Sequence, residues 1–368
     1  MPINNIFESQ RVLITGGTGS LGKTLVKRLL SGKNGVPEKI IVFSRDEAKQ
    51  HFMRVEYLNA KSATDEVIYS NFQRKVEFRI GDVRNQDSVD EAVRNATIVI
   101  NAAALKQVPS CEYFVEESVK TNILGPCNVV RAVGKAKHVH AIIGVSTDKA
   151  CKPVNAMGMT KAIQEKVFIS ANVHSNSKFA CVRYGNVLAS RGSVVPLFHD
   201  QVRKGGPVTI TSRDMTRFLL PLERAVDTIV AAVVYASPGE IFVPVVPSAK
   251  VLDVAMAIIG PRRIPVEDVG IRPGEKMHEI LVSEEECGRA QCLETEIEGD
   301  QYYVVAPALP ELNPSRLRRL DRGDRTAYDL PGEYSSASLP MSFKQTTEML
   351  EKNGLLKIEE EPQGEMLK

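Results

Sequence analysis

Two short segments gather the residues best suited to acid and base chemistry. The first is Thr147-Asp148-Lys149, in which a hydroxyl is followed at once by a carboxyl and an amine. The second contains Met157 and Lys161, whose four-residue spacing puts both side chains on one face of a helix. A shielded carboxyl and a shielded amine that stand side by side can act as acid and base. An ion pair on a surface loop is the structural alternative for Asp148 and Lys149.

A glycine-rich turn follows a predicted strand at Arg11 to Thr15 and precedes a predicted helix at Lys23 to Leu30. In this context such a turn binds the pyrophosphate of a dinucleotide at the helix N-terminus. Gly16 permits the tight turn, Gly19 lets the backbone approach the phosphates, and Gly22 allows close packing of the helix. A glycine-rich turn without a ligand is the alternative. The residues predicted to contact the cofactor here are Thr15, Gly16, Thr18, Gly19, Ser20, Leu21 and Gly22.

Ser44 and Arg45 end the second predicted strand. A site selective for NAD usually carries an acid there, which accepts the ribose 2′-hydroxyl. A hydroxyl followed by a guanidinium suits a 2′-phosphate instead, so the sequence favours NADP over NAD. Asp46 could reach the ribose, although an N-cap of the next helix is the favoured interpretation. Asp82, after the strand Val76 to Ile80, is predicted either to accept from the adenine amino group or to cap a loop.

The composition excludes several classes of protein. The 368 residues include 47 Lys and Arg against 45 Asp and Glu, a net charge of +2 that predicts no nucleic-acid or membrane-surface partner. The six cysteines form no C-x-x-C pair, and His278-Glu279 lacks the H-E-x-x-H spacing, so we expect no metal site. The start shows no leader pattern and no apolar stretch approaches ~18 residues, which predicts a soluble, cytoplasmic protein.

The elements that must position these residues alternate between strands and helices. This rhythm predicts an α/β fold, namely a Rossmann-type doubly wound parallel sheet with a smaller α/β substrate-binding domain. The expected cofactor domain comprises residues 1–189 and 219–247, the expected substrate domain comprises 190–218 and 248–352, and 353–368 form a solvated tail. Further strands are predicted at Lys39 to Phe43, Ala96 to Asn101, Ala141 to Val145, Phe179 to Val182 and Val208 to Thr211.

Together with the glycine-rich turn, Gly144 to Lys149 and Met157 to Lys161 resemble the extended short-chain dehydrogenase/reductase superfamily. There, a Ser or Thr after the fifth strand works with Tyr-x-x-x-Lys on the next helix. The resemblance assigns Thr147 to the hydroxyl position, Lys161 to the lysine that holds the nicotinamide ribose, and Met157 to the Tyr position. A thioether cannot titrate, so Met157 cannot serve as the acid or base. Either the protein only binds nucleotide, or another residue supplies the base.

From about residue 8 to residue 350 the chain resembles, more narrowly, the UDP-N-acetylglucosamine 4,6-dehydratases of bacterial surface-sugar synthesis. The likeness extends to their C5-inverting branch, which serves capsule and O-antigen sugars, and Met also replaces Tyr within that family. The segments that carry the resemblance are Ser146 to Ala150 with Pro153 and Asn155, Ala102 to Pro109, Thr121-Asn122, Arg183 to Val187, Arg191 to Ser193, Met215 to Phe218, Arg272 to Lys276 and Glu333 to Ser336.

The resemblance implies a reaction in which C4 of the sugar gives a hydride to NADP+, water leaves across C5 and C6, and the hydride returns to C6. Oxidation at C4 acidifies the C5 proton, which Lys149 would remove as a neutral amine. Asp148 would give its proton to the departing C6 hydroxyl, and Thr147 would bind the C4 oxygen. The acceptor of the C4 hydroxyl proton stays open between a water relay to Lys161 or the ribose and Lys106.

The resemblance also implies the residues that bind the substrate. Cations in loops of the second domain, with Lys276 among them, would hold the UDP diphosphate, although each alone is more often a surface charge. The substrate-binding candidates are Lys106, Asn186, Arg191, Thr209, Arg217, Arg272 and Glu275, and Ala102 and Ala103 join the cofactor set.

The favoured function is a UDP-N-acetylglucosamine 4,6-dehydratase with 5-epimerase activity, a lyase making a UDP-2-acetamido-2,6-dideoxy-4-hexulose. One alternative is a UDP-hexose 4-epimerase, which would need the titrating Tyr that Met157 replaces. The other is a catalytically silent NADP-binding regulator. Inversion at C5 and a homo-oligomeric, hexameric state rest on the resemblance alone.

Overall fold

The computed structural model describes residues 5–59, 72–188, 193–297, 300–312, 330 and 332–358. The chain divides into two compact units. Unit 1 comprises 1–185, 222–245 and 280–335, and unit 2 comprises 186–221, 246–279 and 336–368. In the described part of the chain, no helix is both long and apolar enough to span a membrane.

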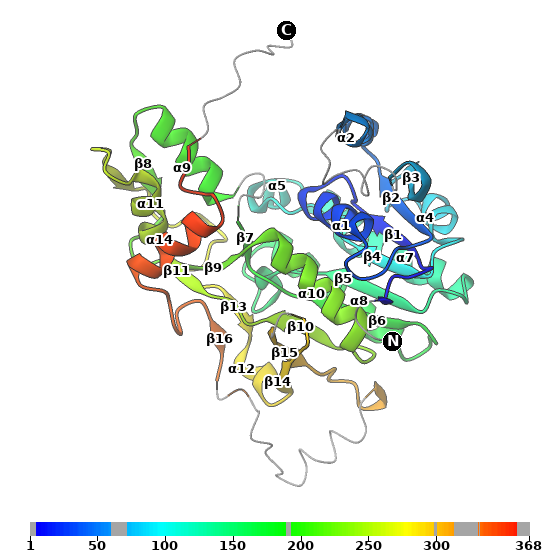
Figure 1. Ribbon diagram of the computed structural model, residues 1–368. Coiled ribbons are helices and arrows are strands. Elements are labelled where there is room, and N and C mark those ends of the chain that lie inside the picture. The colour runs from blue at the N-terminus through cyan, green and yellow to red at the C-terminus, as the bar shows by residue number, and fades with distance from the viewer. Residues whose placement is uncertain are drawn as a thin grey trace. The chain divides into compact units, whose positions relative to one another are not determined.

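Unit 1 is built on a sheet in the order β14-β15-β10-β6-β5-β4-β1-β2-β3 (Figure 1). The strands from β10 to β3 run parallel, the doubly wound arrangement, and β15 and β14 continue the sheet antiparallel. The strands are β1 (Arg11–Thr15), β2 (Lys39–Ser44), β3 (Val76–Ile80), β4 (Ile98–Asn101), β5 (Ala141–Val145), β6 (Lys178–Val182), β10 (Ile241–Pro244), β14 (Ala290–Glu294) and β15 (Gln301–Val305).

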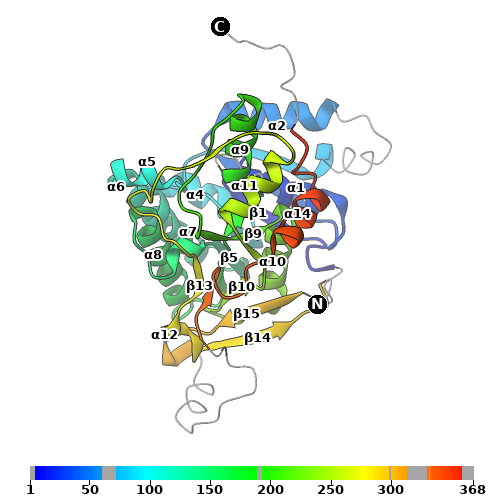
Figure 2. The ribbon, with the colours of Figure 1, turned by 90° about the vertical axis from the view of Figure 1, so that its left-hand side faces the viewer.

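Helices cover both faces of this sheet. Helix α1 packs against α10, α7 packs against both α4 and α8, and the two groups lie on opposite faces (Figure 2). The longer helices are α1 (Ser20–Ser31), α2 (Glu47–Asn59), α4 (Gln86–Val93), α7 (Gly125–Lys135), α8 (Ala156–Ala171) and α10 (Leu222–Tyr235). Shorter elements of unit 1 are α5 (Val108–Tyr113), α6 (Val115–Val119), the π-helix η3 (Lys120–Leu124), the 3-10 turns η4 (Asp148–Ala150) and η5 (Pro310–Leu312), β13 (Ile280–Val282), α12 (Glu284–Cys287) and β16 (Tyr334–Ser335).

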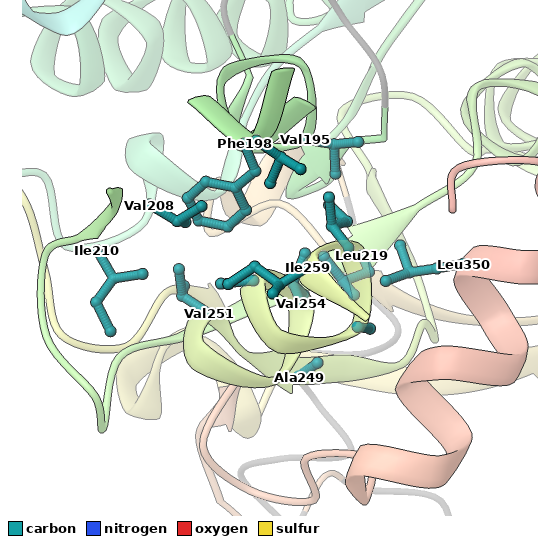
Figure 3. Packing of buried hydrophobic residues seen from close by; sticks show 14 of the residues in the cluster. Val195, Phe198, Val208, Ile210, Leu219, Ala249, Val251, Val254, Ile259 and Leu350 are labelled. Carbon is teal, nitrogen blue, oxygen red and sulfur yellow. The ribbon is translucent and has the colours of Figure 1, made fainter. Parts of the chain in front are cut away.

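Unit 2 has its own apolar core. Helices α9 (Val194–Arg203), α11 (Val251–Ile259) and α14 (Phe343–Lys352) contribute Phe198, Val254 and Leu350, which Figure 3 shows converging. A sheet in the order β11-β9-β7 and the pair β12 and β8 complete the unit. These strands are β7 (Asn186–Val187), β8 (Val208–Ile210), β9 (Thr216–Leu220), β11 (Ser248–Lys250) and β12 (Val266–Asp268).

The predicted fold class is confirmed, whereas the two units divide the chain differently from the predicted domains, above all at residues 280–335 and at the predicted tail. Residues 280–335 were predicted to join the substrate domain, whereas β14 and β15 extend the main sheet through β10. The pairing of β10 with β15 joins strands far apart in sequence, so no local pattern predicts it. The predicted solvated tail, 353–368, includes residues that pack on the unit 2 core. Leu355 and Leu356 contact that core, and the Leu355 carbonyl lies 2.8 Å from His199 Nε2. Residues 359–368 lie outside the described part.

Candidate active site

The turn between β1 and α1 lies against the segment that follows β4. Gly16 has a φ of 67°, and a Cβ there would lie 2.9 Å from Ala103 Cα, so a side chain would collide with backbone. Thr15 Oγ1 donates to Asn101 Oδ1 at 2.8 Å and accepts from the Ala103 N–H at 3.2 Å. Thr15 is buried, so its hydroxyl joins the two segments. Gly19 precedes α1 without a side-chain cap, which leaves the N–H groups of the first turn for an anion.

The end of β2 carries the residues predicted to read the cofactor ribose. Ser44 Oγ lies 2.9 Å from Thr18 Oγ1, and the Arg45 side chain is 59% exposed. Asp46 Oδ1 accepts from the Lys49 N–H at 2.9 Å, at the start of α2, which confirms the N-cap interpretation. Hydrogen bonds from Lys49 lower the pKa of Asp46. Arg45 is therefore the charged group at this position that stays accessible to a ligand.

Asp82 lies just past β3, between two arginines. Its Oδ1 accepts from the Arg84 N–H at 3.0 Å, the cap role, and its Oδ2 is 2.7 Å from Arg84 Nη2 and 4.0 Å from Arg45 Nη1. Burial acts to raise the pKa of Asp82, but the hydrogen bonds and charge of Arg84, together with the charge of Arg45, lower it. The ionised carboxylate can both cap its loop and orient Arg45.

The turn after β5 brings together the three residues predicted for acid and base work. Asp148 is 1% exposed, and its Oδ1 accepts from Thr147 Oγ1 at 2.8 Å and from Lys149 Nζ at 3.0 Å. Its Oδ2 is buried and has no hydrogen-bond partner among the described residues. The pair is therefore not the exposed surface ion pair that was its structural alternative.

Helix α8 places Met157 and Lys161 in the interior of unit 1. Met157 is 4% exposed, and Lys161 is 5% exposed with its Nζ 2.6 Å from the Val145 carbonyl and 2.7 Å from Gln164 Oε1. Burial lowers the pKa of Lys161 to about 8. Asn155 caps the helix by accepting from the Gly158 N–H at 2.7 Å, so the helix starts at a defined residue.

The loop that carries Lys106 is fixed by hydrogen bonds from Asn122, a residue of the π-helix η3. The Asn122 side chain is fully buried, accepts from the Leu105 N–H at 2.8 Å, and donates to the Leu105 carbonyl at 3.0 Å and to Thr160 Oγ1 at 3.0 Å. Burial also lowers the pKa of Lys106. Asn122 thus connects the β4 loop to α8, which positions Lys106 in the same unit as the Thr147 to Lys149 turn.

Tyr184 is the tyrosine nearest in hydrogen bonding to this turn, since its carbonyl accepts from the Asp148 N–H at 3.1 Å. Burial raises the pKa of its phenol well above the usual range. The Tyr184 hydroxyl is therefore protonated at neutral pH.

Unit 2 carries the residues predicted for the nucleotide. Arg217 was predicted to lie in a loop, but it lies in β9, is 9% exposed, and donates to the Thr216 carbonyl at 2.8 Å while its Nε is 3.7 Å from Glu279 Oε1. The reason is that β9 pairs with both β7 and β11, at the centre of its small sheet. Asn186 Oδ1, in β7, is buried and has no hydrogen-bond partner among the described residues.

The other predicted substrate-binding residues are Thr209, Glu275, Arg272 and Arg191. Thr209 Oγ1 accepts from Gln201 Nε2 at 2.7 Å, and Thr211 Oγ1 donates to Glu275 Oε2 at 3.4 Å. Arg272 is exposed. Arg191 lies outside the described residues. The contacts of these residues with a ligand stay predictions.

The polysaccharide biosynthesis protein family model matches residues 12–300. The chain belongs to this family. A relative from Rickettsia bellii (strain OSU 85-389), named UDP-glucose 4-epimerase, is 43% identical over 296 residues, which cover 78% of this chain and 82% of the relative.

Solved structures support the same fold. The X-ray structure of Pen from Bacillus thuringiensis is similar with a TM-score of 0.80 and 31% identity, and the match covers 95% of this chain and 99% of that one. DesIV, a dTDP-glucose 4,6-dehydratase from Streptomyces venezuelae with NAD and TYD bound, has a TM-score of 0.62 at 18% identity, covering 73% and 86%. The second likeness concerns the fold alone.

Sequence reasoning missed a buried polar group directly behind the candidate site. Glu165 is 3% exposed and Arg183 is 2% exposed, and the two form a bidentate pair. One signal was available, because Glu165 follows Lys161 by four residues and so shares its helix face. Arg183 belongs to a segment that carries the family resemblance, but its sequence neighbours do not indicate its partners, which come from α8 and α12.

Proposed function

We propose that this member of the polysaccharide biosynthesis protein family is a UDP-N-acetylglucosamine 4,6-dehydratase that inverts C5. The observation that carries the proposal is the state of Asp148. One carboxylate oxygen accepts from both Thr147 and Lys149, while the other is buried without a hydrogen-bond partner among the described residues. A buried oxygen of this kind is costly unless a ligand completes it. The C6 hydroxyl of a bound sugar would do so after the turn opens to admit it, because Asp148 is 1% exposed here.

The ion pair can become an acid and a base without any change in proton count. A carboxylate beside an ammonium and a carboxylic acid beside an amine hold the same number of protons. A sugar that excludes water from the turn favours the uncharged pair, because the Lys149 ammonium, whose side chain is 23% exposed, loses its hydration. Lys149 would pass one proton to Asp148 Oδ1 and, as an amine, remove the C5 proton. Rotation of the Asp148 carboxyl would bring that proton to the leaving C6 hydroxyl, which departs as water. Thr147 would donate to the C4 oxygen as its carbonyl develops. The C4 hydroxyl proton would pass to Lys106, whose pKa burial lowers, or through a water to the cofactor ribose.

The β1–α1 turn fits a nicotinamide dinucleotide, since Gly16 and the uncapped start of α1 leave backbone N–H groups accessible to a pyrophosphate. When bound, the nicotinamide would accept a hydride from C4 and return it to C6. Lys161 would hold the nicotinamide ribose through its ammonium. We propose NADP as the cofactor because the exposed Arg45 guanidinium suits a 2′-phosphate. NAD is the alternative, and the DesIV structure contains bound NAD.

A UDP-hexose 4-epimerase is the second candidate, favoured by the name of the Rickettsia bellii relative. Met157 argues against it, because the epimerase reaction needs a titrating group where this thioether stands. The Asp148–Lys149 pair, in contrast, has a direct use only in the dehydration.

The test is to incubate the purified protein with UDP-N-acetylglucosamine and NADP+ in D2O and to follow the sugar by proton NMR. A new C6 methyl signal, deuterium at C5 and the coupling constants of an inverted ring are the expected result. Deuterium at C5 with unchanged ring coupling would keep the dehydratase and reject inversion. A change of C4 configuration without a methyl signal would establish the epimerase. Folded protein that binds NADP+ and converts neither UDP-N-acetylglucosamine nor UDP-glucose would favour a silent regulator.

A further inference from the structure

A chain of buried polar contacts runs behind the candidate site, entirely within unit 1. Ser146 Oγ donates to Glu165 Oε1 at 2.5 Å. Arg183 donates to both oxygens of Glu165, at 3.0 Å and 2.7 Å, and to both oxygens of Glu286, at 2.7 Å and 3.0 Å. The proposed reaction uses none of these four residues. Such a network requires an explanation, because burying three charges costs free energy that apolar residues would avoid.

This network holds the ends of β5 and β6 beside the turn Thr147 to Lys149, which we call the catalytic turn because of the proposed reaction. Ser146 immediately precedes Thr147, and its N–H donates to the Val182 carbonyl at 2.7 Å. The Asp148 N–H donates to the Tyr184 carbonyl at 3.1 Å. Val182 and Tyr184 flank Arg183, so the guanidinium anchors the segment that both bonds use. A shift of Glu165 would therefore move the start of the turn that carries Thr147, Asp148 and Lys149.

Glu165 also lies one helical turn after Lys161. Burial lowers the pKa of Lys161, and the negative charge of Glu165 acts in the opposite direction. Cys181, on β6, also faces Lys161, but burial raises the pKa of its thiol so far that it is neutral at pH 7. Glu165 is thus the charged group that favours the Lys161 ammonium.

Other elements packed against α8 bring charged groups of their own. Lys120 pairs with Glu116 and Glu117, and Asp148 pairs with Lys149. The remaining charged residues of these elements are Glu112 on α5, Arg131 and Lys135 on α7, and Lys178 on β6.

We infer that Glu165 is a positioning residue for the proposed reaction, which fixes Ser146 ahead of the turn Thr147 to Lys149 and places a carboxylate one helical turn from Lys161. The inference rests on the proposed function. Glu165→Gln keeps an oxygen for Ser146 and removes the charge beside Lys161. Glu286→Gln is the matched control, because it removes the same charge from the same network on the far side of Arg183.

The measurement is kcat and NADP+ affinity from pH 6 to pH 10, with thermal melting as the test of folding. In Glu165→Gln, we expect the basic limb of both profiles to move to lower pH by about one unit, because the ammonium loses its counter-charge. In Glu286→Gln, the basic limb should stay where it is. A fall in kcat that is equal at every pH would show a merely structural role and overturn the electrostatic part of the inference.

Ser146→Ala tests the positioning part without altering any charge, and it serves if Glu165→Gln does not fold. We expect kcat to fall about tenfold or more with an unmoved basic limb, because the turn loses its anchor. Unchanged kcat in Ser146→Ala would overturn the positioning role. Wild-type protein that forms no C6 methyl product would defeat the proposed function, whereas wild-type turnover with unmoved Glu165→Gln profiles would defeat this inference alone.

Discussion

Gly158, in the first turn of α8, lies against the backbone of the turn Thr147 to Lys149. A Cβ at this position would lie 2.1 Å from the carbonyl oxygen of Lys149 and 3.0 Å from its carbonyl carbon. Both are backbone atoms, so no side-chain rotation can relieve the contact. Gly158→Ala should therefore push α8 away from the turn that carries Asp148 and Lys149.

The size of the effect follows from the overlap. An ordinary contact begins near 3.4 Å, so the backbone must separate by roughly 1 Å. Overpacking of this kind costs about 3 kcal/mol, of which the better helix propensity of Ala recovers at most about 1 kcal/mol. We expect a net loss of about 2 kcal/mol, or a decrease in Tm of roughly 3 °C for a chain of 368 residues. A displacement of about 1 Å at reacting groups lowers kcat by about a hundredfold.

The assay is thermal unfolding together with the rate of C6 methyl formation from UDP-N-acetylglucosamine. Gly134→Ala is the matched control, because this glycine lies in α7 and an added Cβ meets no described atom within 4 Å. The control should retain wild-type kcat and gain up to about 1 kcal/mol of stability. Wild-type Tm and kcat in Gly158→Ala would refute the claim that α8 and the turn must approach this closely.

Three further predictions concern the cofactor and the acid–base groups. Arg45→Ala should weaken NADP+ binding about tenfold or more and leave NAD+ binding unchanged, as measured by calorimetric titration; equal losses for the two cofactors would contradict the 2′-phosphate assignment. Lys149→Ala should retain NADP+ affinity and lose C6 methyl formation and C5 deuteration in the NMR assay, since no amine remains to take the C5 proton. Because burial lowers the pKa of Lys161 to about 8, its ammonium is present below that pH and lost above it, so turnover should fall above pH 8; a kcat plateau extending to pH 10 would exclude this assignment.

The local elements of unit 1 were predictable because their signals lie within a few residues of one another. The predicted strands at Arg11–Thr15, Val76–Ile80 and Ala141–Val145 are confirmed to the residue. The first and third are apolar runs typical of parallel strands covered on both faces, whereas Val76–Ile80 alternates apolar and charged residues and lies at the edge of the sheet. The N-cap at Asp46 was likewise predictable, because the capping side chain and its N–H partner are three residues apart.

The sequence also shows that Asp148 and Lys149 are adjacent, but it does not show how deeply they are buried or which atoms they contact. Only the tertiary structure buries Asp148 and leaves one of its oxygens without a partner among the described residues. The same holds for Arg217, which changes from an expected loop cation to a buried strand residue beside Glu279.

What the sequence by itself determined about this protein is the α/β fold, the glycine-rich turn and the order of the chemical groups along the chain. Tertiary structure decided which unit residues 280–335 join, and it brought Glu286 to Arg183 across 103 residues. The physical reason is that strand pairing and burial of charge depend on partners distant in sequence. Such contacts form only when loop closure and packing together are favourable, which no short segment encodes alone.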